Sequence, residues 1–186
     1  MLTLEEAKEI IDIFLNDPTE ANFKIVQETI YPFLSVVDQE STPFQDKLFS
    51  YVLTREPFWI FEYEIFAGNR LMALFARRLL DVSDGAYASM LFKLFGKLSR
   101  LNPELFLTMF KDDIKKPVLE LAVTESIFLE GTEKYQRYDR YDLIQRIKAL
   151  RTVTNPELRN IRDYCILLLE RELKENGLYQ MGYSRK

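Results

Sequence analysis

Apolar residues recur along the chain at the three- and four-residue intervals that are typical of α-helices. In residues 84–101 the apolar positions fall within half a turn, and Lys93, Lys97 and Arg100 lie opposite them, which predicts an amphipathic surface helix. In residues 70–81 apolar side chains surround the axis almost completely, which predicts a central buried helix. Because a strand pattern of alternating apolar and polar residues is not evident, we predict an all-α fold.

Prolines and capping residues mark where these helices begin. Proline is favoured in the first helical turn, where its missing N–H costs no hydrogen bond, and six of the seven prolines fit such a place. Pro32 is the exception, and we expect it to kink or end the second helix. Together with the periodicity, this punctuation predicts about ten helices, over residues 3–16, 18–36, 43–53, 57–67, 70–81, 84–101, 103–112, 116–129, 133–151 and 156–176.

The connections between these helices are mostly two to six residues long, so consecutive helices should be antiparallel neighbours. Residues 1–186 are expected to form a single domain, with 176–186 as a flexible tail. Asn-Pro-Glu-Leu occurs at 102–105 and again at 155–158. Together with this repeated tetrapeptide, the regular succession of helix, short turn and helix resembles that of HEAT-like and armadillo-like repeat proteins. This resemblance implies an irregular helical stack. A compact helical bundle is the equally weighted alternative.

The chain lacks histidine and has one cysteine, Cys165. Without histidine, Ser-His-Asp and Cys-His catalysis and all histidine-containing metal sites are excluded. Phosphate-binding and dinucleotide-binding glycine motifs are also absent from the sequence. Cys165 falls in the apolar stripe of the last helix, where it should behave as a small hydrophobic residue. We therefore expect a protein that is not an enzyme and that uses no metal and no cofactor.

The sequence also indicates in which compartment the protein resides. No stretch of 18 uncharged apolar residues is present, and the acidic N-terminus does not resemble a signal peptide. A cytoplasmic protein is favoured, and export is the alternative if Met1 replaces a removed leader.

The charges are distributed unevenly along the chain. Residues 1–69 carry 13 acidic and 4 basic residues, whereas 70–186 carry 16 acidic and 21 basic ones. This split could orient a partner or support self-association, but solvated helix faces that happen to differ in charge are the favoured explanation.

A run of tyrosine and arginine residues begins the helix predicted at 133–151. Its tyrosines point away from the aliphatic stripe further along the same helix. Exposed tyrosine and arginine are the residue types that dominate protein–protein contacts. Packing within the protein, or a break near residue 140, would explain the pattern without a partner. The candidate partner-binding residues are Tyr135, Arg137, Tyr138, Arg140 and Tyr141.

Two other groups of residues have competing interpretations. The segment 56–66 holds the single tryptophan among four other aromatic residues, and we interpret it as core, with a hydrophobic groove as the alternative. Arg78 lies among apolar positions of the buried helix 70–81. A guanidinium there needs a carboxylate partner or must extend its charged end to solvent. We interpret Arg78 as part of a structural ion pair, with an anchor for an anionic ligand as the second possibility.

These observations favour a non-catalytic protein-interaction module that binds another protein or a second copy of itself. The first alternative is a carboxylate-based enzyme or a small-ligand binder with a cavity between helices. The second alternative is nucleic-acid binding through the tyrosine- and arginine-rich helix. Acidic residues within that helix and the overall net charge of −4 argue against the nucleic acid.

Overall fold

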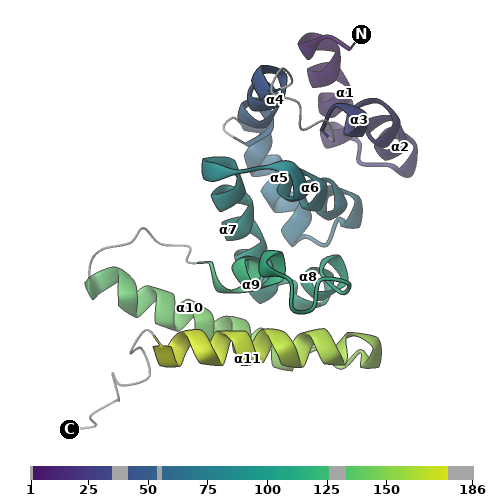
Figure 1. Cartoon of the computed structure of the whole chain (residues 1–186). Helices are drawn as coiled ribbons and strands as arrows, with labels where there is room; N and C mark the ends of the chain where they lie inside the picture. The colour runs from purple at the N-terminus through teal and green to yellow at the C-terminus, as the bar shows by residue number, and fades with distance from the viewer. Residues whose placement is uncertain (1, 35–41, 54–55, 126–132, 176–186) are drawn as a thin grey trace, which may run out of the picture. The chain divides into compact units, whose positions relative to one another are not determined.

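The computed structural model describes residues 2–34, 42–53, 56–125 and 133–175, with the main chain alone at 42, 56–57 and 133–139 (Figure 1). Every regular element in these ranges is a helix, which confirms the all-α prediction. The chain divides into two compact units, residues 1–91 and 92–186. The single domain and the helical repeat expected from the sequence stay predictions. None of the helices in the described ranges is long and apolar enough to cross a membrane.

The first unit is built from six helices and the beginning of a seventh. A capping box begins α1: the Thr3 amide donates to Glu6 Oε2 at 2.8 Å, and the Glu6 amide donates to Thr3 Oγ1 at 3.3 Å. Asn69 caps α6 through the amides of Leu71 and Met72. The helices are α1 (Leu4–Asn16), α2 (Glu20–Thr29), α3 (Tyr31–Leu34), α4 (Thr42–Leu53), α5 (Glu56–Phe66), α6 (Arg70–Val82) and the first part of α7 (Gly85–Leu101).

The core of the first unit forms around α6. From Leu71 to Leu80 every residue of α6 is buried or half-buried, which confirms the central helix predicted from the sequence. The Phe75 ring meets the Phe14 ring of α1 edge-on, with centroids 5.7 Å apart, and the Phe61 ring of α5 at 5.9 Å. Tilted and edge-on arrangements suit the quadrupoles of these rings.

The second unit contains the end of α7 and the helices that follow it. Asn102 caps α8, because the Leu105 amide donates to its Oδ1 at 3.3 Å. In Figure 1, α10 and α11 lie side by side, and these two helices pack on one another. The elements are α8 (Pro103–Met109), α9 (Pro117–Thr124), α10 (Glu133–Arg151), a 3-10 helix (Pro156–Leu158) and α11 (Arg159–Glu175).

Several helix boundaries differ from the prediction. The helix expected at 18–36 begins later, because Thr19, and not Asp17, caps α2 through the Asn22 amide. It is also divided in two before Pro32, as that residue led us to expect. The helix expected at 103–112 ends at Met109, and a turn follows in which Lys115 has a φ of 67°. Part of the helix expected at 116–129 lies outside the described residues.

Arg146 of α10 is the largest fully buried side chain of the described residues, with an exposure of 0%. Its Nε donates to Asp142 Oδ2 at 2.6 Å, and its Nη1 and Nη2 donate to the carbonyls of Val123 (2.7 Å) and Glu125 (3.0 Å) at the end of α9. Asp142 also accepts from Arg100 Nη1 of α7 at 2.9 Å. A cation at a helix C-terminus satisfies unpaired carbonyls and the helix dipole together. This charged network therefore joins α7, α9 and α10 inside the second unit.

Gly96 of α7 provides the space for this network. A Cβ at Gly96 would lie 2.8 Å from Nη1, 2.9 Å from Nη2 and 3.0 Å from Cζ of Arg146. One turn away Ser99 is also fully buried, and its hydroxyl donates to the Gly96 carbonyl at 2.7 Å. The helix predicted as a one-sided amphipathic surface helix thus has a second buried side, whereas Leu101, predicted on the apolar side, is 52% exposed.

Candidate functional site

Helix α5 presents a large aromatic surface to solvent. The side chain of Trp59, the single tryptophan, is 73% exposed, and one turn further Tyr63 is 70% exposed. Ile60, between them on the same side of the helix, is 49% exposed. We call these three residues the α5 face. Isolated apolar residues are common on protein surfaces, but a cluster that contains tryptophan and tyrosine is typical of sites where partners bind.

The amino-acid pattern of α5 explains why it has two apolar sides. Its sequence, EPFWIFEYEIF, carries apolar residues all around the helix. Phe61 and Ile65 take the inward side with exposures of 0%, so the first unit gains its core from that side alone. The interpretation of this segment as core is therefore correct for these two residues and wrong for Trp59, Ile60 and Tyr63. Two apolar sides on an 11-residue helix were the signal in the sequence that one side would remain exposed.

The first unit, which contains the α5 face, is acidic as a whole. Helix α5 contains three glutamates and neither lysine nor arginine; Glu62 is buried, Glu64 is half-buried, and the side chain of Glu56 lies outside the described residues. The unit to which it belongs, residues 1–91, has 15 acidic and 7 basic residues, a net charge of −8. The remaining residues, 92–186, have 14 acidic and 18 basic ones. At long range, this net charge attracts cationic partners to the first unit and disfavours anionic ones.

The residues predicted as a partner-binding surface on α10 are described only in part. Tyr141 is 60% exposed, and Arg140 is half-buried. The side chains of Tyr135, Arg137 and Tyr138 lie outside the described residues. The aliphatic stripe of the same helix does face inward: Leu143, Ile147 and Leu150 are buried, and Ile144 is half-buried. Asp142 and Arg146 lie on this buried side too, which the sequence interpretation had missed.

Arg78 is half-buried on α6. Its guanidinium lies over the ring of Tyr31, with Cζ 5.5 Å from the ring centroid, a cation–π arrangement. Burial raises the pKa of the Tyr31 phenol, and the positive charge of Arg78 opposes that shift. The neighbouring Arg77 pairs with Asp81 one turn along the helix. Tyr31 is thus an aromatic neighbour of Arg78, and the role of Arg78 in an ion pair or as an anion anchor stays a prediction.

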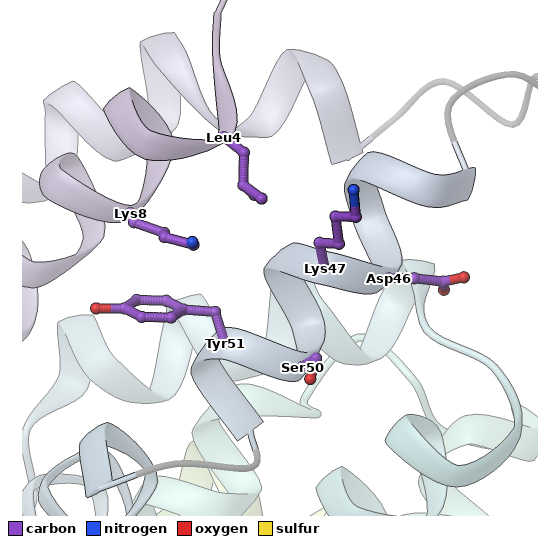
Figure 2. A pocket seen from close by; sticks show the side chains of 6 residues that line it. All are labelled: Leu4, Lys8, Asp46, Lys47, Ser50 and Tyr51. Carbon is purple, nitrogen blue, oxygen red and sulfur yellow. The ribbon is translucent and has the colours of Figure 1, made fainter.

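A pocket of about 410 Å³ opens between α1 and α4 in the first unit (Figure 2). The amine of Lys8 and the side chain of Leu4 point into it from α1, whereas the Asp46 carboxylate points away from it. The Lys8 amine lies 5.5 Å from the centroid of the Tyr51 ring and pairs with Glu5 at 2.7 Å. The lining residues are Leu4, Lys8, Asp46, Lys47, Ser50 and Tyr51.

The Tyr51 side chain is held in place at this pocket. Its hydroxyl approaches both carboxylate oxygens of Asp12, at 2.6 Å and 2.7 Å, and donates its single proton to that group. A charge-assisted hydrogen bond of this kind restrains the phenol and so orients the ring beneath Lys8. The pocket therefore has a rigid aromatic wall with a cation above it.

Two other ionisable side chains, those of Cys165 and Glu6, have environments that are explained by the fold. Cys165 is buried, as predicted, and burial raises the pKa of its thiol to about 12. The hydrogen bonds from Thr3 hold the pKa of the Glu6 carboxyl below its usual value, which is the expected effect of the capping box. Among the residues that the structure describes, no three Cys, Asp or Glu side chains are grouped so as to hold a metal ion.

Comparison with known proteins adds no relative to this picture. The chain matches no protein-family model, and neither a curated protein nor a solved structure is significantly similar to it.

Proposed function

We propose that this protein is a protein-binding module, and that the α5 face is the surface that docks onto its partner. The exposure of Trp59 at 73%, together with that of Tyr63 at 70%, carries the proposal. Tryptophan and tyrosine are the residues most enriched among those that dominate binding energy. They offer a large and rigid contact area at a small cost in side-chain entropy.

The area available sets the affinity that can be expected. An aromatic side chain buries about 150–250 Å² when it is covered, so covering what is exposed of Trp59 and Tyr63 removes roughly 200–350 Å² from water. At ~25 cal/mol per Å², this corresponds to about 5–9 kcal/mol before the cost of association. That cost is of similar size, so this face alone supports weak binding, and an attractive charge on the partner is needed for more.

Charge identifies the kind of partner. The first unit has a net charge of −8, and the charged residues of α5 are glutamates, of which Glu64 is half-buried and Glu62 is buried. The partner that fits is a protein with an apolar strip edged by lysine or arginine, such as a cationic amphipathic helix. An anionic membrane and an α5–α5 dimer would both place like charges together, and they are disfavoured for that reason.

Trp59 provides a direct test, because the chain contains no other tryptophan. An 18-residue synthetic amphipathic helix of leucine and lysine is titrated into the full chain while the indole emission is recorded. We expect a saturable blue shift and protection of the indole from quenching by acrylamide, which is neutral. A peptide of the same pattern made of leucine and glutamate should leave the emission unchanged.

Two variants distinguish specific binding at the α5 face from nonspecific hydrophobic binding. The double substitution Ile60→Ser and Tyr63→Ser keeps the reporter and should weaken binding by about tenfold or more. The matched control, Ile13→Ser with Ile25→Ser, removes two apolar side chains of the same unit that are 50% and 46% exposed, and it should bind as wild type does. Equal binding of both peptides, a shift with anionic vesicles alone, or dimerisation of the free chain would contradict the proposal.

Tyr141, with an exposure of 60%, is the described part of the surface predicted on α10. A Tyr141→Ser variant in the same titration tests whether that helix contributes. Weakened binding would show that α10 also binds the peptide.

A further inference from the structure

We infer that the pocket between α1 and α4 binds a small organic anion, a carboxylate or phosphate monoester that carries an apolar group. The site lies apart from the α5 face and does not depend on the proposed function. Its volume of about 410 Å³ falls within the range of pockets that hold small molecules. The ligand class follows from the charges and the aromatic wall of the pocket.

Two lysines supply the positive charge. Lys8 lines the pocket from α1 and Lys47 lines it from α4, one helix on each side (Figure 2). The single acidic lining residue, Asp46, directs its carboxylate outward in the same view. An ammonium group is a compact charge with three donors, and it binds carboxylate and phosphate oxygens without the planar match that arginine requires. Two of them across one opening favour a small anion at this place, although the first unit as a whole is acidic.

The present partner of Lys8 can be replaced at small cost. Glu5 pairs with Lys8 at 2.7 Å, but the Glu5 side chain is 81% exposed, whereas that of Lys8 is 25% exposed. An ion pair in which one side chain is largely exposed to solvent contributes little to stability, so an incoming anion can take the place of Glu5. The lysine stem is already packed and its amine is held over the Tyr51 ring, so little side-chain freedom is lost when an anion binds.

The rest of the wall suits an apolar group attached to the anion. Leu4 points into the pocket from the beginning of α1, and the Tyr51 ring lies along the opposite side. Because the Tyr51 hydroxyl is bonded to Asp12, the phenol turns its ring, and not its polar tip, toward the space. A planar or aliphatic group of a few carbon atoms can pack on these two side chains while its anion binds the Lys8 amine, with Lys47 across the opening.

The test uses phenyl phosphate as the probe, titrated into the full ¹⁵N-labelled chain at constant ionic strength. We expect saturable shifts of backbone amides in residues 4–8 and 46–51, with a dissociation constant below ~1 mM. Phenol at the same concentrations should produce no such shifts, because it lacks the anion. The double substitution Lys8→Met and Lys47→Met should weaken binding by about tenfold or more, whereas Lys8→Arg with Lys47→Arg should retain most of it.

A matched control removes the same charge elsewhere. Lys93→Met with Lys97→Met changes two half-buried lysines of α7 and should leave the affinity for phenyl phosphate as it is in wild type. Thermal unfolding followed by circular dichroism shows that each variant is folded before it is titrated. Equal weakening by both double variants, shifts spread over both units, or failure to saturate below ~10 mM would each overturn the inference, since each indicates general attraction of an anion to a charged surface.

Discussion

Replacing Gly96 by alanine should destabilise the second unit, against the usual preference of helices. In the interior of a helix, alanine is more favourable than glycine by about 1 kcal/mol. In α7, however, the new methyl group would lie 2.8–3.0 Å from three atoms of the Arg146 guanidinium. Carbon atoms of real side chains do not approach other groups that closely, so the guanidinium has to move.

The size of the effect follows from what holds that guanidinium. Arg146 donates hydrogen bonds to Asp142 and to the carbonyls of Val123 and Glu125. Hydrogen bonds that involve a charged group contribute about 1.5–3 kcal/mol each, and overpacking a filled interior costs about 1–3 kcal/mol. Weakening one such bond already outweighs the gain in helix propensity. We expect Gly96→Ala to lower the free energy of unfolding of the second unit by about 1–3 kcal/mol.

The assay has to report on the second unit, and Trp59 belongs to the first. Native-state hydrogen exchange, read at backbone amides of α10 and α11, measures the local free energy of opening without relying on that indole. A double-mutant cycle with Arg146→Met provides the control, because methionine lacks the atoms that Gly96 approaches. In that background Gly96→Ala should be neutral or stabilising by up to ~1 kcal/mol.

The Arg146→Met substitution by itself should cost about 3–5 kcal/mol, since it leaves buried groups without their charged partner. If Gly96→Ala protects the amides of α10 in the wild-type background, the explanation of this glycine is wrong. The same conclusion follows if the substitution has equal effects in both backgrounds.

Three smaller predictions follow from other parts of the structure. Thr3→Ala should destabilise α1 by about 1 kcal/mol through loss of its cap. Because the pKa of Glu6 is lowered in the folded protein, the stabilisation that depends on the Glu6 charge is present above the usual carboxyl pKa and is lost as pH falls through the lowered pKa. Unfolding measured over an acid titration will show this pH dependence. The Cys165 thiol, with a pKa raised to about 12, should react with an aromatic disulfide at pH 8 roughly a thousandfold more slowly than in the urea-unfolded chain, and reaction at the unfolded rate would place it outside the core. Acrylamide, a neutral quencher, should quench Trp59 in the free protein nearly as strongly as it quenches a tryptophan peptide, and a shielded indole would contradict the α5 face.

The helices and most of their ends could be predicted from the sequence, because helix formation follows local signals. The cap at Thr3 and the proline start at Pro103 act within one turn and need no other part of the chain. The end of the helix expected at 103–112 was misplaced, since residues 110–116 contain no glycine, asparagine or proline that would mark a helix end after Met109.

The candidate surfaces were harder to predict, because exposure is decided by what packs on a helix and not by the helix itself. Trp59 and Phe61 are both aromatic residues of α5, yet the first is 73% exposed and the second is fully buried. Arg146 was overlooked for a related reason, although Asp142 one turn earlier and the apolar residues around it place the pair on the inward side. The pocket between α1 and α4 joins residues some 40 positions apart, and a single sequence does not show such pairings.

The close approach of Gly96 and Arg146 also has an evolutionary consequence. Neither position is free to change alone: a larger residue at 96 displaces the guanidinium, and a shorter one at 146 leaves the end of α9 without its donors. In descendants of this chain the two positions should therefore vary together, with a small residue at 96 wherever arginine is kept at 146. In a lineage that has lost this arginine, larger residues should be tolerated at position 96, so a larger residue at 96 would indicate that arginine at 146 had already been replaced.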